Sequence, residues 1–498
     1  MLKNLAANAL GRFWSVLANY LFIPIYIQLL GIESYAIISF SLVLVALAAA
    51  LDAGMTATLT CEFADRRHTD ADRRGLLQTL ESVYLLLGAL IVAVFFVSAE
   101  AVARRWLQLE NLPPDEVGRY LRVVGVGLAF QMVANFYVGG LLGLERHVMA
   151  NALQVAWGMA RSALVVLPLL VWPSPLVFFG WQTATTVVYA LVARWRLAGV
   201  LGAGHRGFRF RVDPATLRRV GAFAGGMLAI SAVASVNGQF DRLVLSGMLS
   251  VLDLGYYMLA VALAQGLLTL MSPVGTVMLP RFANLYSAGE LDRAVDLFRN
   301  ALRGGTIVIG AAAMTLCFHA EEVLFAWTGN PALVAQAAPV LPYIVIGTAL
   351  LALQVLPFSV AIANGYTRIN VVMAIAAVGL SLPAYVLAVD RYGMLGAAAV
   401  WMTLQAVATP IYFALVHRRF LPGRLSFGQY VLALAPPFAV AAGANLLLQE
   451  VPTAGLARGA MLLWLAGVAL AVLGITGFLL PAALRRRVLQ WPLRRAAA

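Results

Sequence analysis

The chain has 498 residues, of which 62% are hydrophobic and only 11% are charged. That composition excludes an ordinary soluble domain and indicates a polytopic membrane protein. The formal net charge of +13 does not indicate a nucleic-acid-binding protein, because the arginines lie in short stretches between apolar runs. The two cysteines, Cys61 and Cys317, form no CxxC motif and predict neither a disulfide framework nor a metal site.

Apolar runs of about 18 to 25 residues predict an all-α fold with about fourteen transmembrane helices. The first run is too long for the apolar region of a signal peptide, so we expect it to remain as the first span. The predicted spans are 9–30, 36–60, 76–98, 119–142, 149–171, 176–198, 220–249, 254–279, 303–325, 338–362, 369–389, 395–416, 429–448 and 458–480.

The placement of lysine and arginine supports this count of spans. If both termini are cytoplasmic, 27 of the 35 basic residues fall on the cytoplasmic side and 6 on the other side, while Arg161 and Arg242 lie within spans. Cytoplasmic loops of membrane proteins carry an excess of basic residues. We therefore expect a multi-pass protein with cytoplasmic termini. No loop is long enough to hold a soluble catalytic domain.

A Gly-rich and Arg-rich stretch, residues 199–219, divides the chain. We expect a first six-helix lobe over 1–218 and a second over 219–424. The remaining residues, 425–498, hold the last two helices and a basic tail.

A weak internal repeat supports the division into two lobes. Tyr35 has a counterpart in Tyr257, and Gly143 has one in Gly365, both at an offset of 222 residues. The same offset relates Arg146 to Arg368. Each repeated residue lies at the matching helix boundary, so the lobes are predicted to be parallel repeats related by an axis along the membrane normal. Chance similarity in a Gly-rich and Arg-rich composition is the alternative.

One cation, Arg161, lies in the middle of the apolar span 149–171. It is roughly ten residues from either end, hence about 15 Å from water on both sides at ~1.5 Å per residue. At that depth the guanidinium must face other protein or a wet cavity. An intramembrane cation is by default a functional-site hypothesis, and the alternative is a structural pairing with a helix-end carbonyl or an acid.

Several short stretches at helix boundaries resemble the polysaccharide transporter family. These oligosaccharide flippases belong to the superfamily that also contains multidrug and toxin extruders. The stretches are Leu30-Gly31-Ile32-Glu33-Ser34-Tyr35, Leu51-Asp52-Ala53-Gly54, Gly143-Leu144-Glu145-Arg146-His147, Asp241-Arg242-Leu243-Val244-Leu245-Ser246, Leu254-Gly255-Tyr256-Tyr257 and Leu279-Pro280-Arg281-Phe282-Ala283.

The resemblance implies two six-helix lobes around a central cavity that opens alternately to either side of the membrane. It also implies a cargo of lipid-diphosphate-linked oligosaccharide repeat units, moved from the cytoplasmic to the periplasmic leaflet of a bacterial inner membrane for surface or exopolysaccharide synthesis. Fourteen helices exceed the common twelve and match the number associated with peptidoglycan lipid-precursor flippases, which remain an alternative.

A diphosphate headgroup needs cations in a wet cavity, because an unpaired buried charge carries a large desolvation cost. Arginine stays charged and offers a planar fork to phosphate oxygens. We expect Arg161 to bind the diphosphate, Arg12 to meet it nearer the cytoplasmic entrance, and Arg242 to act in the outward-facing half of the cycle. A membrane anchor is the alternative for Arg12, and a structural bond is the alternative for Arg242. Asp52 and Asp241 are predicted to be counter-charges or ion-coupling sites.

Sugar hydroxyls need neutral hydrogen-bonding groups and aromatic faces. Ordinary helix-to-helix bonds and interface anchoring are the alternatives for such residues. The predicted sugar contacts are Asn19, Gln131, Asn135, Asn237, Gln239, Gln265 and Trp157.

The sequence holds no GxxxxGK[ST] phosphate loop and no HExxH motif. We therefore expect no enzymatic activity, no metal and no cofactor, with transport driven by a gradient of H⁺ or Na⁺, the membrane potential or consumption of the sugar chain outside. The expected partners are a polyprenyl-diphosphate-linked oligosaccharide, the membrane, and polysaccharide polymerase or export machinery, with no nucleic acid. Two alternatives stay open: an ion-coupled exporter of cationic drugs, and a polytopic enzyme acting on lipid-linked sugars.

Overall fold

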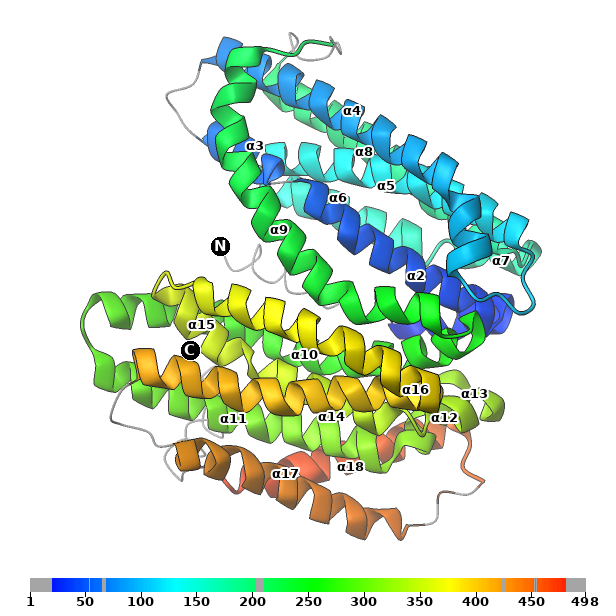
Figure 1. Cartoon of the computed structure of the whole chain (residues 1–498), viewed down its shortest axis with the longest axis vertical. Helices are drawn as coiled ribbons and strands as arrows, with labels where there is room; N and C mark the ends of the chain where they lie inside the picture. Colours follow the sequence, from blue (N-terminus) through cyan, green and yellow to red (C-terminus); the bar gives the residue numbers. More distant parts are fainter. Residues whose placement is uncertain are drawn as a thin grey trace, which may run out of the picture. The chain divides into compact units, whose positions relative to one another are not determined.

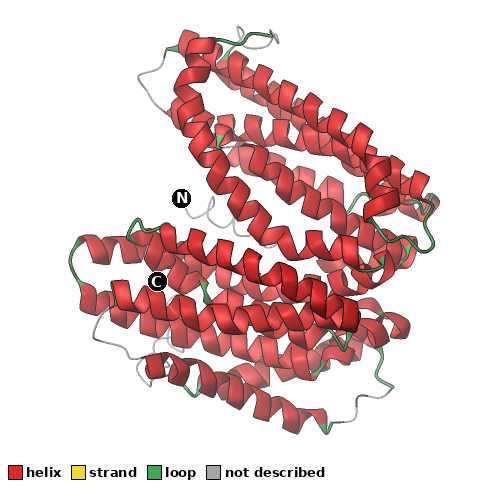
Figure 2. Cartoon of the chain, in the orientation of Figure 1, coloured by secondary structure: helices red, strands yellow, loops and turns green. Residues whose placement is uncertain are grey.

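A computed structural model describes residues 20–52, 54–64, 69–202, 210–421, 427–451, 453 and 455–480. The described chain is helical apart from short connections and contains no β-strand (Figure 2). It forms two compact units, Met1–Gly255 and Tyr256–Ala498, which are described separately.

The first unit begins in its described part with the helix Tyr20–Leu30. Its other elements are α2 (Ile32–Ala49), η1 (Ala50–Asp52), α3 (Met55–Ala64), α4 (Asp70–Ala101), η2 (Val102–Trp106), α5 (Pro114–Gly143), α6 (His147–Ser162), α7 (Val166–Val171), α8 (Pro175–Leu201) and α9 (Pro214–Met248) (Figure 1). The short η2 is a π-helix that extends α4.

Helix α10 (Val251–Ser287) starts in the first unit and continues into the second. The second unit contains α11 (Leu291–Phe318), α12 (Ala320–Thr328), α13 (Pro331–Ala337), α14 (Leu341–Leu353), α15 (Val355–Ala363), α16 (Arg368–Phe420), α17 (Phe427–Gln449) and α18 (Arg458–Gly477). Within this unit α11 packs against α14, α17 and α18, so the two C-terminal helices cover one side of it (Figure 1).

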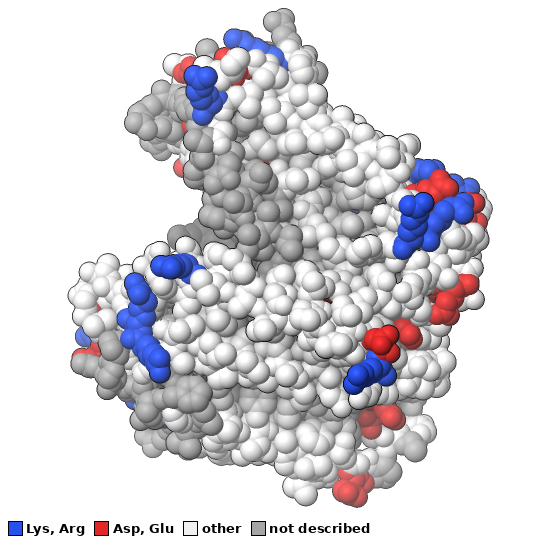
Figure 3. All heavy atoms as spheres, in the orientation of Figure 1, with Lys and Arg blue, Asp and Glu red and all other residues white. Residues whose placement is uncertain are grey.

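The predicted all-α membrane architecture is confirmed. In the described part of the chain, nine helical stretches are long and apolar enough to cross a membrane, and three shorter apolar helices accompany them. Within the described residues, each predicted span coincides with a helix or a pair of helices, although 369–389 and 395–416 lie in α16, whose backbone breaks at Gly393. Of the first predicted span, 9–30, only residues 20–30 are described, and they are helical. On the face shown in Figure 3, charged side chains gather near the helix ends and the helix flanks are almost free of them.

Helix α9 belongs to the first compact unit, where it packs against α2, η1 and α3. The predicted second lobe starts at residue 219, within this helix. The division into lobes over 1–218, 219–424 and 425–498 stays a prediction, because compactness of a unit does not define which helices move together.

Two glycines allow α3 and α5 to approach closely. A Cβ at Gly139 would lie 2.4 Å from the Thr56 Cγ2, and one at Gly143 would lie 2.6 Å from the Thr60 carbonyl oxygen. The Thr60 hydroxyl donates to the Gly139 carbonyl oxygen at 3.0 Å. Small residues four apart commonly mediate such contacts between membrane helices.

The ends of α5 and α15 share one turn geometry, which refines the predicted repeat. In each, a residue with positive φ follows the helix, namely Glu145 at 57° and Gly365 at 68°. In each, the next N–H bonds to the carbonyl five residues back: Arg146 to Leu141 and Tyr366 to Ala361, both at 2.9 Å. This is the Schellman pattern. The residues that match in this turn, Glu145 with Gly365 and Arg146 with Tyr366, are 220 apart. The predicted repeat offset of 222 residues therefore does not align this turn.

A strap, residues 102–113, crosses one end of the first unit and is fastened to α2. One oxygen of the buried Glu33 carboxylate accepts the backbone N–H groups of Glu110, Asn111 and Leu112 at 3.1, 3.1 and 3.2 Å. An anion here satisfies three donors that would otherwise lack a partner. Glu33, within one of the stretches that carry the family resemblance, therefore has a structural role.

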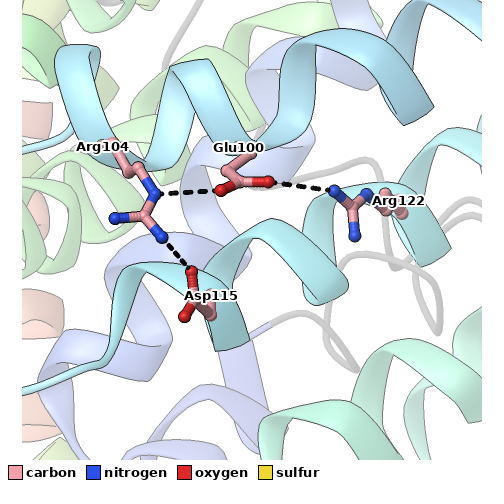
Figure 4. A network of polar contacts seen from close by, with 4 residues as sticks. All are labelled: Glu100, Arg104, Asp115 and Arg122. Carbon is pink, nitrogen blue, oxygen red and sulfur yellow. Dashed lines mark hydrogen bonds and ion pairs between the residues drawn. The ribbon is translucent and has the colours of Figure 1, made fainter.

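Further bonds tie the strap to the helices beside it. The Trp106 Nε1–H donates to the Ser246 hydroxyl at 2.9 Å, and the Val251 N–H donates to the Gln108 carbonyl at 2.8 Å. Exposed ion pairs link the end of α4 to α5 (Figure 4). Arg104 contacts Glu100 at 3.1 Å and Asp115 at 2.6 Å, and Arg122 contacts Glu100 at 3.5 Å. Because these side chains are solvated, their contribution is small compared with that of Glu33.

We expect Glu33→Ala to lower the free energy of unfolding by roughly 1.5–3 kcal/mol, because three backbone N–H groups lose a charged acceptor. Glu33→Gln keeps a neutral acceptor, so its free energy of unfolding should lie between those of the wild type and Glu33→Ala. Thermal unfolding of the protein in lipid nanodiscs measures the effect. Glu450→Ala, at an exposed acid, is the control. Equal melting temperatures for Glu33→Ala and the control would show that the strap does not depend on this carboxylate.

Candidate functional site

The predicted span 149–171 is broken just after Arg161. Helix α6 ends at Ser162 and α7 begins at Val166, with turns between them. Pro168 explains the break: it has no N–H to offer the carbonyl four residues earlier, and its ring clashes with that carbonyl. Arg161 therefore lies in the last turn of a helix that stops inside the apolar segment.

The break leaves the backbone carbonyls of Ala160, Arg161 and Ser162 without helical hydrogen bonds. The Leu164 N–H bonds to the Met159 carbonyl, five residues back, at 3.3 Å instead of to the carbonyl four residues back. Unsatisfied carbonyls are costly inside a membrane. Side chains from α8 and from the helix Tyr20–Leu30 supply the missing donors. These bonds are Trp181 Nε1 to the Ala160 carbonyl at 2.9 Å, Gln182 Nε2 to the Arg161 carbonyl at 3.2 Å, and the Tyr26 hydroxyl to the Ser162 carbonyl at 2.6 Å.

The Arg161 side chain is partly exposed and bonds only to neutral groups in the described part of the chain. Its Nε–H donates to the Gln182 Oε1, and its Cζ lies 5.2 Å from the centroid of the Trp157 ring. Among the described residues, no carboxylate forms an ion pair with this guanidinium, and its two Nη groups make no hydrogen bond. The positive charge is therefore held in place but not neutralised.

Trp157 supports Arg161 from the same helix and is itself fixed. Its Nε1–H donates to the Thr186 hydroxyl at 3.3 Å. Tyr189 stacks on its ring with centroids 4.9 Å apart and planes inclined by 13°. One face of the indole is thus already covered, and the ring also makes a cation–π contact with Arg161. The predicted sugar contact of Trp157 stays a prediction.

Asp52 lies at a second break, between α2 and α3. The 3₁₀ turn η1 ends at Asp52, and Gly54 has a φ of 70°, a conformation that glycine adopts at little cost. The predicted single span 36–60 is therefore two helices. One Asp52 oxygen accepts the Thr56 hydroxyl at 2.5 Å and the Tyr84 hydroxyl. The carboxylate pairs with no cation among the described residues, so its charge is also uncompensated there.

Asp241 and Arg242 are neighbours on α9 but do not form an ion pair with each other. Arg242 Nη1 donates to the Gln239 Oε1 at 3.0 Å, one turn back on the same helix. The Arg242 Nε is buried and has no hydrogen-bond partner in the described residues. Gln239 thus bonds to Arg242, and the roles predicted for all three residues stay predictions.

The remaining predicted sugar contacts are scattered. Gln131 donates to Asn135 at 3.0 Å on the face of α5, and both side chains reach the surface of the unit at least in part. Gln265 is partly buried in α10, within the second unit. Arg12 and Asn19, as well as the side chain of Asn237, lie outside the part of the chain that the structure describes.

The sequence prediction did not single out Glu81, an acid within the predicted span 76–98. Its carboxylate is buried in α4 and one oxygen accepts both the Arg194 Nε–H at 2.7 Å and the Tyr137 hydroxyl at 2.6 Å. The two donors come from α8 and α5. The sequence signal that could have identified Glu81 is the presence of an acid within an apolar span. In contrast to Asp52, Glu81 is paired with a cation and joins three helices.

The fold is shared with solved transporters. The chain resembles the lipid II flippase MurJ in an inward closed conformation, with a TM-score of 0.71, 12% identity and coverage of 99% of this chain and 100% of that chain. It also resembles a multidrug resistance MATE family transporter of the MOP superfamily in an inward-facing conformation, with a TM-score of 0.66, 14% identity and coverage of 82% and 94%. The chain therefore shares its fold with these two membrane proteins.

The sequence matches the family described as polysaccharide biosynthesis protein over residues 1–286, which is more than half of the chain. The chain belongs to this family, and the predicted family resemblance is confirmed. A putative O-antigen transporter of Shigella flexneri is 21% identical over 383 residues, which cover 75% of this chain and 87% of that protein. These relatives are transporters and flippases rather than enzymes.

We expect Glu81→Ala to destabilise the first unit by about 3–5 kcal/mol, because it removes the buried carboxylate that accepts from both Arg194 and Tyr137. Replacing both residues by leucine should recover much of that loss. Unfolding of single and double variants in nanodiscs gives the coupling free energy. The exposed pair Glu290–Arg293, at 2.7 Å, is the control and should give less than about 1 kcal/mol. A coupling no larger than that of the control would mean that the Glu81 pair does not hold the helices together.

Proposed function

We propose that this protein is a flippase for oligosaccharides linked to a polyprenyl diphosphate. The observation that carries the proposal is the state of Arg161: an arginine of an apolar segment, fixed by neutral groups, with no acidic partner in the described residues. Membership of the polysaccharide biosynthesis family and similarity to a putative O-antigen transporter support the class of cargo.

The chemistry of the cargo explains why such an arginine is needed. A diphosphate that leaves water must exchange its hydration for charged hydrogen bonds, or the free-energy cost is prohibitive. The guanidinium stays protonated and can bind two phosphate oxygens side by side. The lipid tail needs no such partner and stays in the hydrocarbon. Arg12 and Arg242 are further proposed contacts of the diphosphate.

In this proposal the cargo moves from the cytoplasmic to the periplasmic leaflet of a bacterial inner membrane by alternating access, and both termini are cytoplasmic. The excess of basic residues on one side of the predicted topology supports that orientation. A polysaccharide polymerase or export machinery is the proposed consumer of the flipped repeat unit.

A multidrug exporter is the second candidate function. It is favoured by the MATE-like fold and by Asp52, whose uncompensated carboxylate suits a cationic substrate. Arg161 argues against it, because an uncompensated guanidinium repels a cation. Drug susceptibility of a deletion strain separates the two functions, since only an exporter of drugs should protect the cell.

We expect Arg161→Ala to abolish surface polysaccharide while protein abundance in the membrane is unchanged. Loss of even one of the two charged hydrogen bonds to phosphate, about 1.5–3 kcal/mol, should weaken binding of a polyprenyl diphosphate lipid by roughly 10- to 100-fold, and loss of both by more. Arg161→Lys keeps the charge but not the planar fork, so it should be intermediate. The exposed Arg293→Ala is the control. Normal polysaccharide in the Arg161→Ala strain would remove the basis of the proposal.

We further propose that Asp52 couples transport to an inward gradient of H⁺ or Na⁺. One of its oxygens holds both hydroxyl donors, and the other oxygen makes no hydrogen bond to a described residue. A carboxylate at a helix break, beside hydroxyl oxygens, offers the hard ligands that a proton or a sodium ion requires.

We expect Asp52→Asn to retain binding of the diphosphate lipid and to lose the acceleration of flipping by an imposed pH or sodium gradient. The asparagine keeps the size and the hydrogen-bond acceptor but not the charge. Flipping of a fluorescent lipid-linked oligosaccharide in proteoliposomes, with and without each gradient, measures this. Asp296→Asn, at an exposed acid on α11, is the control. A variant that still responds to both gradients would exclude Asp52 as the coupling residue.

A further inference from the structure

Arg161 and Gln182 are joined by a reciprocal pair of hydrogen bonds. The Gln182 Oε1 accepts the Arg161 Nε–H, and the Gln182 Nε2 donates to the carbonyl oxygen of Arg161 itself. One amide therefore fixes both the side chain and the backbone of the arginine. Gln182 lies on α8, where its backbone carbonyl oxygen accepts the Thr186 hydroxyl at 2.7 Å.

The edge of the guanidinium that Gln182 uses determines what the arginine can still bind. Occupation of Nε leaves the edge formed by the two Nη groups, which can donate two parallel hydrogen bonds to a phosphate or carboxylate. The other groups around the arginine, Tyr26 and Trp157, are neutral. None of these partners supplies negative charge.

The choice of an amide over a carboxylate has a clear electrostatic effect. A glutamate at residue 182 would offer the same acceptor geometry but would form an ion pair and cancel the field of Arg161. A glutamine orients the guanidinium without lowering its attraction for an anion. It also supplies the N–H that the broken helix needs, which a carboxylate lacks at neutral pH.

We propose that Gln182 is a positioning residue that presents the Nη edge of Arg161, still charged, to the diphosphate of the cargo. The inference rests on the proposed function, because it assumes that Arg161 binds that diphosphate. It adds a residue that the sequence did not mark, because Gln182 is one of several polar side chains in the predicted span 176–198 and lies on a different helix from the arginine that it orients.

The decisive variant is Gln182→Glu. The glutamate loses the hydrogen bond to the Arg161 carbonyl but gains an ion pair with the guanidinium, which offsets that loss, so the protein should remain folded with a melting temperature within a few degrees of wild type. Its affinity for a polyprenyl diphosphate lipid in nanodiscs should fall by about tenfold or more, because the ion pair competes with the lipid phosphate. A purely structural role for Gln182 predicts that affinity follows melting temperature instead. Gln336→Glu, the same substitution at an exposed position, is the matched control.

A second variant covers the case in which the glutamate is not tolerated. Gln182→Met keeps the volume and removes both hydrogen bonds, so the charge of Arg161 remains but its orientation is lost. We expect reduced affinity for the diphosphate lipid, with recovery in Gln182→His, whose ring can still accept from Arg161. Wild-type affinity in Gln182→Met would overturn the positioning role.

The outcomes for the inference and for the proposed function are distinguishable. If Arg161→Ala loses binding while Gln182→Glu binds like wild type, the positioning role is wrong and the function stands. If Arg161→Ala also binds like wild type, the diphosphate site itself is wrong, and the inference fails with it. Loss of binding in both variants, with a stable Gln182→Glu protein, supports both.

Discussion

Backbone hydrogen bonding inside an apolar segment is the constraint on which the candidate site depends. A membrane helix that stops in hydrocarbon exposes carbonyl groups that lipid cannot satisfy. At the break between α6 and α7, three such carbonyls are each bonded by a side chain from a neighbouring helix. The same bonds fix the last turn of α6, and that turn carries Arg161. The geometry of the charged group is thus a consequence of how the break is repaired.

Four charged side chains of the first unit divide into two groups. Glu81 is paired with Arg194, and the carboxylate of Glu33 is surrounded by backbone donors. Both stabilise the packing of helices. Arg161 and Asp52 have only neutral partners among the described residues, and each lies at a helix break. An uncompensated charge in an apolar environment costs free energy that the fold must offset, and this is expected where a charged cargo or an ion will supply the missing partner.

The sequence predicted the fold well because hydropathy and length are strong signals for membrane helices. In the described part of the chain, the predicted spans coincide with helical segments, and Arg161 and Asp52 could be identified as isolated charges within two of them. The breaks within these two spans were not predicted, since Pro168 and Gly54 are compatible with a kink as well as with a stop. Gln182 was missed for a different reason. Its role depends on which helix packs against α6, and helix pairing is set by three-dimensional packing that periodicity does not reveal.

The repaired break also has a consequence for the order of assembly. Residues 147–171 are synthesised before α8, yet two of the three donors that satisfy their carbonyls, Trp181 and Gln182, are on α8. During insertion, the carbonyls that Trp181 and Gln182 bond to therefore lack these donors until α8 enters the bilayer beside this segment. Helices α6 to α8 therefore depend on one another, and a chain truncated before Trp181 would leave two of these three carbonyls without their side-chain donors.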